Sequence, residues 1–219
     1  MSARLEDWRL DEDAHEDDPA YRAVKAEIHA RDDHVCAYCG FRSRRFQECH
    51  HLSGDHRDNR PGNLATVCAF CHMVFHVGRT GGKGGEALLV WYPEISQTML
   101  HHMARAAYIA IRFAGPSLRE AARNFLAAMR ERSEVLPERI GTCDPTLLGE
   151  ALLRLPPADY QRRGEMLKEV RLFPLGRYYA GGRDRFTDML EYWVSPEGPY
   201  AEVPPERWRE FYDGILRVR

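Results

Sequence analysis

Apolar and polar positions along the chain predict short mixed elements first and a longer run of helices afterwards. The first helix is expected to begin at Asp18-Pro19, where an N-cap residue precedes a proline at the first helical position, and to end near Arg31. Tyr21, Val24 and Ile28 recur along this segment at helical spacing. This apolar stripe predicts that the helix packs on its neighbours through one face.

The segment after this helix changes between extended and helical patterns over short distances. Residues 46–52 are predicted to form a strand, residues 53–62 a polar loop and residues 71–76 a short helix. The apolar stretch 88–92 is predicted to be a strand that returns to these elements. The N-terminal part should therefore contain a small unit of mixed secondary structure.

From residue 96 onward the pattern is helical. Helices are predicted over residues 99–113, from a capping box at 117–120 to Glu134, and from Asp144-Pro145 to Leu155. Further helices are predicted over residues 158–172, 184–192 and 205–216. Prolines between these segments mark breaks, so the C-terminal half is expected to be an irregular helical bundle.

The composition shows little net charge. The chain of 219 residues is 44% hydrophobic and 29% charged, with a formal net charge of −2, so bulk charge does not hold it on nucleic acid. Residues 11–18 are acidic, whereas several arginines surround the cysteine pairs. No apolar run approaches the roughly 20 residues of a membrane span, and no signal-peptide pattern opens the chain. We expect a cytoplasmic protein without membrane insertion.

Six cysteines carry the strongest chemical signal. Four of them form two Cys-x-x-Cys pairs, namely Cys36, Cys39, Cys68 and Cys71. Disulfides are one use of such residues, but no export signal precedes them, and two close pairs are typical of a structural zinc site. The pattern predicts one zinc ion held by four thiolates, and chance pairing of reduced cysteines is the alternative. Cys49 and Cys143 lie outside the pairs and are expected to be partly buried apolar residues.

Histidines and an asparagine lie between and after the cysteine pairs. They are His50, His51, Asn63, His72 and His76. Adjacent histidines on a strand point to opposite faces, whereas two histidines four residues apart on a helix share a face and suit one ion. Surface histidines without a metal are the alternative. Asp55, His56 and Asp58 in the intervening loop are expected to be solvated polar residues.

Residues 22–77 resemble the HNH, or His-Me finger, nucleases on the strength of these residues and their spacing. The resemblance implies that His50, His72 and His76 hold a second divalent cation, Mg²⁺, Mn²⁺, Ni²⁺ or Zn²⁺, at a scissile phosphate. It implies that His51 is the general base and that Asn63 orients it across the loop. The fold class it implies is α+β, with a small four-cysteine zinc ββα-metal finger followed by a mainly helical region.

Beyond the finger, the chain is similar to the IcmJ/DotN family of type IVB (Dot/Icm) secretion components. The motifs that carry this similarity include residues 36–41, 46–48, 52–55, 91–97, the glycine-rich stretch 78–85 and, more weakly, 171–174. The family implies a cytoplasmic accessory protein that binds the tail of the coupling ATPase at the inner-membrane secretion machinery. Members can keep the four cysteines and lose the histidines.

Two functions follow from these patterns. The first is a divalent-metal-dependent DNA endonuclease or nickase, which makes the protein an enzyme with DNA as its partner. The second is a non-catalytic, zinc-stabilised adaptor that binds the tail of a type IV secretion coupling protein. The expected domains are an acidic flexible N-terminus (1–17), an HNH zinc finger domain (18–92) and a helical domain (93–219).

Overall fold

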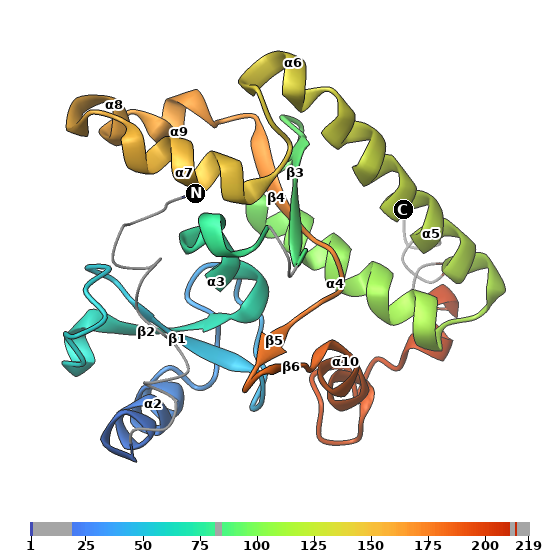
Figure 1. The fold of residues 1–219 in the computed structure, drawn as a ribbon. Helices are drawn as coiled ribbons and strands as arrows, with labels where there is room; N and C mark the ends of the chain where they lie inside the picture. Colours follow the sequence, from blue (N-terminus) through green and yellow to red (C-terminus); the bar gives the residue numbers. More distant parts are fainter. Residues whose placement is uncertain (2–18, 82–84, 211–212, 214–219) are drawn as a thin grey trace.

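The computed structural model describes residues 1, 19–81, 85–210 and 213, and shows helices around small two-stranded sheets (Figure 1). Apart from residue 1, the acidic N-terminus predicted to be flexible (1–17) and the proposed cap Asp18 lie outside these residues. The helices of the N-terminal part and of the middle are α2 (Pro19–Arg31), α3 (Ala69–Phe75), α4 (Gln97–Phe113) and α5 (Pro116–Glu134). The later helices are α6 (Leu136–Ile140), α7 (Pro145–Arg154), α8 (Pro157–Gln161), α9 (Arg163–Met166) and α10 (Phe186–Val194).

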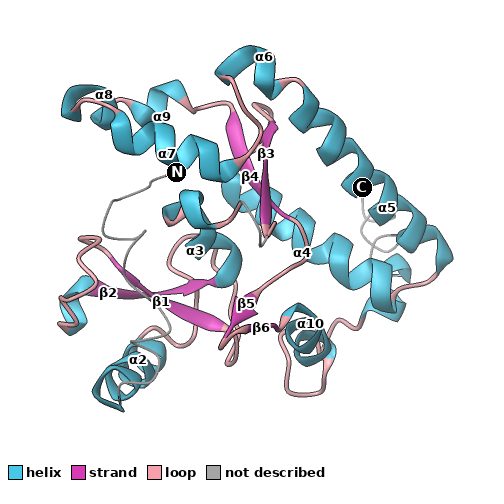
Figure 2. Ribbon diagram, in the orientation of Figure 1, coloured by secondary structure: helices cyan, strands magenta, loops and turns pink. Residues whose placement is uncertain are grey.

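The N-terminal unit contains two antiparallel strands and the helix that follows them (Figure 2). Strand β1 (Gln47–His51) pairs with β2 (Leu64–Cys68), with His50 opposite Ala65. The predicted strand, loop and short helix are thus confirmed in type and order. Helix α2 packs on this pair, and Ile28 is fully buried on the face that the apolar stripe predicted.

Strand β3 (Ala87–Trp91) forms where the apolar stretch predicted it, but its expected partner was wrong. It pairs antiparallel with β4 (Val170–Pro174) and not with the finger strands, and Leu89 lies opposite Leu172. Both leucines are almost fully buried. Strand β3 ends directly before the predicted domain boundary at residues 92/93, and its partner β4 lies far beyond that boundary. The two predicted domains are therefore joined by a strand pair.

The same pairing corrects the predicted helix over residues 158–172. Helices α8 and α9 are single turns, and the chain then becomes extended from Val170. Along β4, buried and exposed positions do not alternate, because Leu172, Phe173 and Pro174 are all buried. A short run of buried residues is compatible with a strand or a helix, so the sequence does not distinguish the two. A second small hairpin, β5 (Tyr179–Ala180) with β6 (Arg183–Asp184), turns through Gly181 and Gly182, both at positive φ.

The starts of the long helices follow local chemistry. Helix α7 begins as predicted, because the Asp144 carboxylate accepts a hydrogen bond from the Thr146 backbone N–H at 2.7 Å. The predicted capping box at 117–120 was wrong: α5 begins two residues earlier, with Gly115 in place of Ser117 at the N-cap and Pro116 at the first position. Near the C-terminus, the predicted helix 205–216 begins as the short 3₁₀ helix η4 (Pro205–Arg207), and most of its later residues are outside the described part of the chain.

One apolar core joins the two parts of the chain. It contains Val67 and Phe70 from the finger together with Leu100, Ile109 and Trp193 from the helices. Helix α3 contacts β1, β2, β4 and α4, and in Figure 1 it lies between the two strand pairs. None of the helices among the described residues has the length and apolar character needed to cross a membrane.

Candidate metal centres

The first centre brings together the four predicted cysteines. Cys36 and Cys39 lie on a turn after α2, which Gly40 closes at a φ of +72°, and the Cys36 backbone N–H donates to Phe41 at 3.0 Å. Cys68 ends β2 and Cys71 lies in α3. All four Sγ atoms lie within 4.8 Å of one another. Two knuckles that are distant in sequence therefore present their sulfurs to one point.

The spacing of the sulfurs fits a tetrahedral zinc ion. Sγ of Cys39 lies 3.7 Å from Sγ of Cys68, and two sulfurs of a tetrahedron with Zn–S bonds of about 2.3 Å are roughly 3.8 Å apart. Hydrogen bonds with the other three cysteines lower the pKa of Cys36, whereas the hydrogen bonds of Cys71 with its three partners raise the pKa of Cys71. Thiols this close share protons and do not all ionise unless a cation joins them. The cluster can hold a structural metal ion.

The second centre is formed by His50 from β1 and by His72 and His76 at the end of α3. Their candidate ligand nitrogens lie within 4.8 Å of one another. The Nε2 atoms of His72 and His76 are 3.0 Å apart, close to the roughly 2.9 to 3.4 Å expected for two imidazoles on one ion. Burial, followed by the charges of His76 and His50, lowers the pKa of His72 well below 6.5. The structure thus gathers three predicted ligands, of which His72 is held neutral, the form that binds metals.

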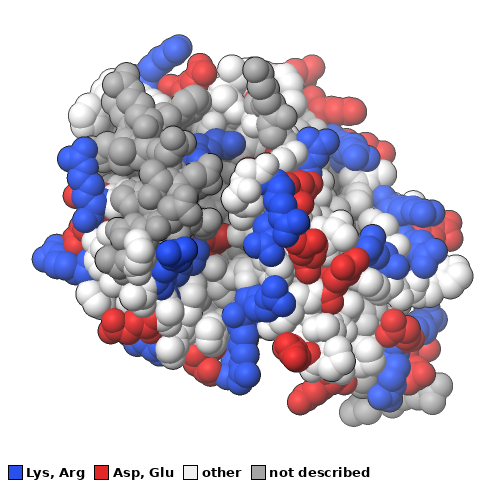
Figure 3. All heavy atoms as spheres, turned by 60° about the horizontal axis from the view of Figure 1, so that its bottom comes forward, with Lys and Arg blue, Asp and Glu red and all other residues white. Residues whose placement is uncertain are grey.

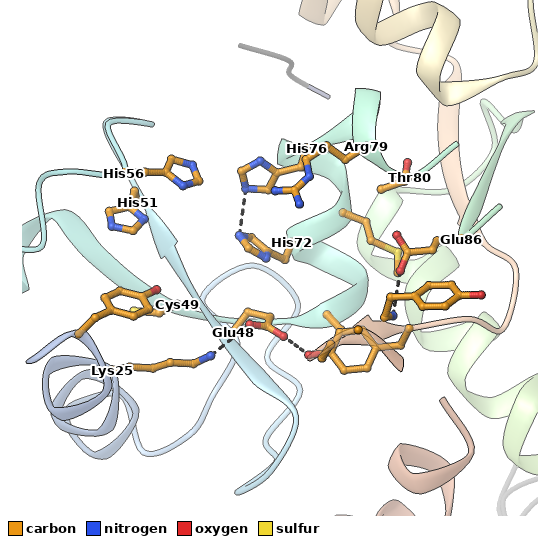
Figure 4. Close-up of a pocket in the computed structure, with 17 residues that line it drawn as sticks. Lys25, Glu48, Cys49, His51, His56, His72, His76, Arg79, Thr80 and Glu86 are labelled. Carbon is orange, nitrogen blue, oxygen red and sulfur yellow. Dashed lines mark hydrogen bonds and ion pairs between the residues drawn. The ribbon is translucent and has the colours of Figure 1, made fainter. Parts of the chain in front are cut away.

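His51 and its loop lie beside this centre (Figure 4). Nε2 of His51 is 2.9 Å from Oδ1 of Asn59 and donates to it, so Nδ1 is the basic nitrogen of the ring. Asn63 ties the ends of the loop together: its Oδ1 accepts from the Ser53 backbone N–H and its Nδ2 donates to the Asp58 carbonyl, both at 2.9 Å. Asn59 thus hydrogen-bonds to the His51 ring, whereas the Asn63 amide hydrogen-bonds to the main chain of the loop. The roles of base and orienting residue stay predictions.

His56 was expected to be a solvated loop residue, and this was wrong. Its side chain is 8% exposed. Its ring stacks on His51 with the centroids 4.9 Å apart and meets the His76 ring edge-on at 5.4 Å. The loop folds back over the strand, and residue spacing alone carries no signal for that contact. Asp55 is exposed, as predicted, and its carboxylate accepts the Arg57 backbone N–H at 3.0 Å. Asp58 is half-buried and pairs with the exposed Arg60 at 2.6 Å.

A cavity of about 270 Å³ opens beside the histidines. His51, His56, His72 and His76 line one side of it, as Figure 4 shows. The other side carries Glu48, which pairs with Lys25 at 3.3 Å and accepts a hydrogen bond from the Tyr178 hydroxyl. The four-cysteine cluster has four protein ligands and suits a closed structural ion, whereas three histidines at a cavity leave coordination positions for other ligands.

One face of the molecule has mixed charge. On the face in Figure 3, basic and acidic side chains are interspersed among neutral ones. This agrees with the formal net charge of −2. Binding of a polyanion through this visible face would depend on local contacts and not on a broad basic surface.

Comparison with known proteins extends the picture to the whole chain. No family model matches it. The chain is 29% identical over 191 residues to the type 4 apparatus protein DotN of Legionella pneumophila subsp. pneumophila, covering 86% of this chain and 85% of that protein. Because the finger is only the stretch 22–77, an alignment of this length includes much of the helical half. The resemblance to the IcmJ/DotN family that the sequence motifs indicated is thus supported over most of the chain.

Proposed function

We propose that the protein is a zinc-stabilised adaptor of a type IV secretion apparatus that binds the tail of the coupling ATPase. The observation that carries the proposal is the similarity to DotN over 86% of the chain. A chain that shared only a nuclease finger with its relatives would be matched over a much shorter stretch.

The core supports an adaptor role because it makes the metal centre part of the scaffold. Cys36, Cys68 and Cys71 are buried in the same cluster as Leu100 and Trp193. A structural zinc at this position stabilises the contact between the finger and the helices. Such a scaffold needs no turnover to function, and the histidines are then not required for partner binding.

The test is a titration of the purified, zinc-loaded protein with synthetic C-terminal tails of the coupling proteins encoded beside it, followed by calorimetry. We expect one tail to bind with 1:1 stoichiometry, and His51→Ala to bind equally well. Flat isotherms with every tail, from protein that is folded and contains zinc, would refute the adaptor.

A second candidate function is metal-dependent cleavage of DNA. The observation that favours it is the convergence of His50, His72 and His76, with His51, which hydrogen-bonds to Asn59, lining the same cavity as His72 and His76. In this function the three histidines would hold a divalent cation against a phosphate, and the basic nitrogen of His51 would accept a proton from the attacking water.

Cleavage of supercoiled plasmid distinguishes the nuclease function from the adaptor function. The protein is incubated with plasmid and Mg²⁺, Mn²⁺ or Ni²⁺, beside His51→Ala and a control, His34→Ala, that removes a histidine outside the cluster. If the protein is a nuclease, the wild type and His34→Ala cut the plasmid only when metal is present, and His51→Ala does not cut it. Intact plasmid with all three metals, from folded protein, excludes the nuclease and leaves the adaptor standing.

A further inference from the structure

Three residues of helix α4 contact the two turns that carry the four cysteines. Nη2 of Arg105 donates to Sγ of Cys68 at 3.5 Å, and Nδ1 of His101 lies 3.3 Å from Sγ of Cys71. Nε2 of His102 lies 2.9 Å from the carbonyl oxygen of Cys39. Both knuckles are thus contacted by one helix that lies outside the finger sequence.

Arg105 is a buried cation without a carboxylate. Its side chain is 0% exposed, and its guanidinium lies 3.7 Å from the centre of the Phe41 ring. Among the residues that the structure describes, no carboxylate forms an ion pair with it, and its Nε has no hydrogen-bond acceptor. Burial of an uncompensated charge is strongly unfavourable, so a negative group must lie close to it.

The four thiolates supply that negative group. A zinc ion with four thiolates carries a net charge of about −2, and Arg105 touches one of the sulfurs directly. Four neutral thiols would leave the guanidinium uncompensated. The buried arginine is therefore an indication, independent of cysteine spacing, that the cluster is an ionised metal centre.

The proton of His101 is placed by its neighbours. The side-chain oxygen of Gln97 accepts a hydrogen bond from the Leu172 backbone N–H at 2.8 Å, and Nε2 of Gln97 donates to the Leu172 carbonyl at 2.7 Å. The same Nε2 is 2.8 Å from Nε2 of His101 and has a second hydrogen to donate to it. His101 thus accepts at Nε2 and carries its proton on Nδ1, which points to Cys71. A hydrogen-bonded path runs from β4 to a zinc ligand.

The same reasoning orients His102. Nη1 of Arg105 lies 3.2 Å from Nδ1 of His102 and donates to it. The proton of His102 is then on Nε2, which donates to the Cys39 carbonyl. All the hydrogen bonds of α4 to the knuckles have the helix as donor and the cysteines as acceptors, as an anionic centre requires.

We propose that Arg105 and His101 are outer-sphere partners of the four-cysteine zinc, and that metal binding and docking of α4 on the finger are one coupled event. Arg105 is the counter-charge, and His101 is a neutral N–H donor. Loss of zinc leaves Arg105 buried without an anion and so weakens the joint between the finger and the helical half. This coupling holds whether the protein is an adaptor or a nuclease.

The test follows folding of the full chain by circular dichroism against buffered free zinc. Arg105→Met keeps an apolar side chain and loses the charge, whereas Arg105→Lys keeps the charge and loses the planar group. The matched control is Arg112→Met on the same helix, because Arg112 is 45% exposed and pairs with Glu191 at the surface. We expect the zinc midpoint to rise about 10- to 100-fold for Arg105→Met, less for Arg105→Lys, and not for Arg112→Met. If Met is tolerated as well as Lys, Arg105 acts by packing alone and the proposal is overturned.

A spectroscopic measurement tests the His101 contact without relying on stability. Cobalt replaces zinc in the wild type and in His101→Phe, which keeps the ring volume and removes the N–H group. We expect the thiolate-to-cobalt charge-transfer bands to move to lower energy in the variant, because a sulfur that loses a hydrogen bond holds its electrons less tightly. Unchanged bands would show that His101 does not act on the metal centre.

Discussion

Replacing Leu172 by alanine should destabilise the finger and the helices together. Leu172 is 1% exposed on β4 and lies opposite Leu89 of β3, which is fully buried. Truncation of a buried leucine costs 2–5 kcal/mol, and a site enclosed by other leucines is expected to lose about 3 kcal/mol. The hydrogen bonds to Gln97 use the main chain of Leu172, so the substitution leaves them in place.

Thermal unfolding of the zinc-loaded protein measures this loss. About 3 kcal/mol corresponds to a fall in Tm of roughly 6–12 °C for a chain of this size. Leu147→Ala is the matched control, because Leu147 is 52% exposed on α7 and its truncation should cost less than about 0.5 kcal/mol. Far-ultraviolet circular dichroism and tryptophan fluorescence should report one shared transition. Two separate transitions, or a shift no larger than that of Leu147→Ala, would refute the view that β3 and β4 join the two parts.

Three further predictions concern the metal, pH and a helix start. Cys68→Ser should lose the tightly held zinc and much of the folded population, as metal analysis and circular dichroism will show; a fully loaded, folded variant would contradict the four-thiolate site. Burial, then Lys25, lowers the pKa of His29 to about 4 from 6.5, so the unfolded chain takes up a proton that the folded chain does not, and stability falls as pH drops from 6.5 towards 4. His29→Gln should reduce that fall in urea midpoints between pH 7 and pH 5, and an unchanged fall would exclude His29 as a contributor. Asp144→Ala should cost about 1 kcal/mol in urea unfolding through loss of the α7 cap, whereas an effect no larger than that of Asp159→Ala would argue against the cap.

Local chemistry made part of this structure predictable. The two cysteine pairs need only a turn each to present their sulfurs, so their spacing was sufficient to predict the cluster. His72 and His76 lie one helical turn apart, so periodicity predicted that they share a face. The place of His50 beside them was implied by the resemblance to HNH nucleases. The cap of α7 depends on Asp144 and Pro145, which are neighbours in the chain, so the sequence contains the information needed to predict it.

The parts that were missed depend on contacts between distant residues. The partner of β3 lies about eighty residues later, and β4 resembles a helical segment because it is buried on consecutive positions. Asn59 and His56 reach His51 through the fold of the loop, and Arg105 reaches Cys68 from another domain of the predicted scheme. Gly81 shows the same effect, because a Cβ atom there would lie 2.2 Å from the carboxylate of Asp144. Close approach of α7 therefore explains the glycine at this position.

The most direct test of the adaptor function is capture of the protein from its own cells. The chain is tagged at its chromosomal locus, the membranes are gently solubilised, and the captured material is analysed for the coupling ATPase of the type IV apparatus. We predict that this ATPase is enriched with the wild-type protein and equally with His51→Ala, and is lost with Cys68→Ser. Intact, zinc-containing protein that is recovered without the coupling ATPase would contradict the account.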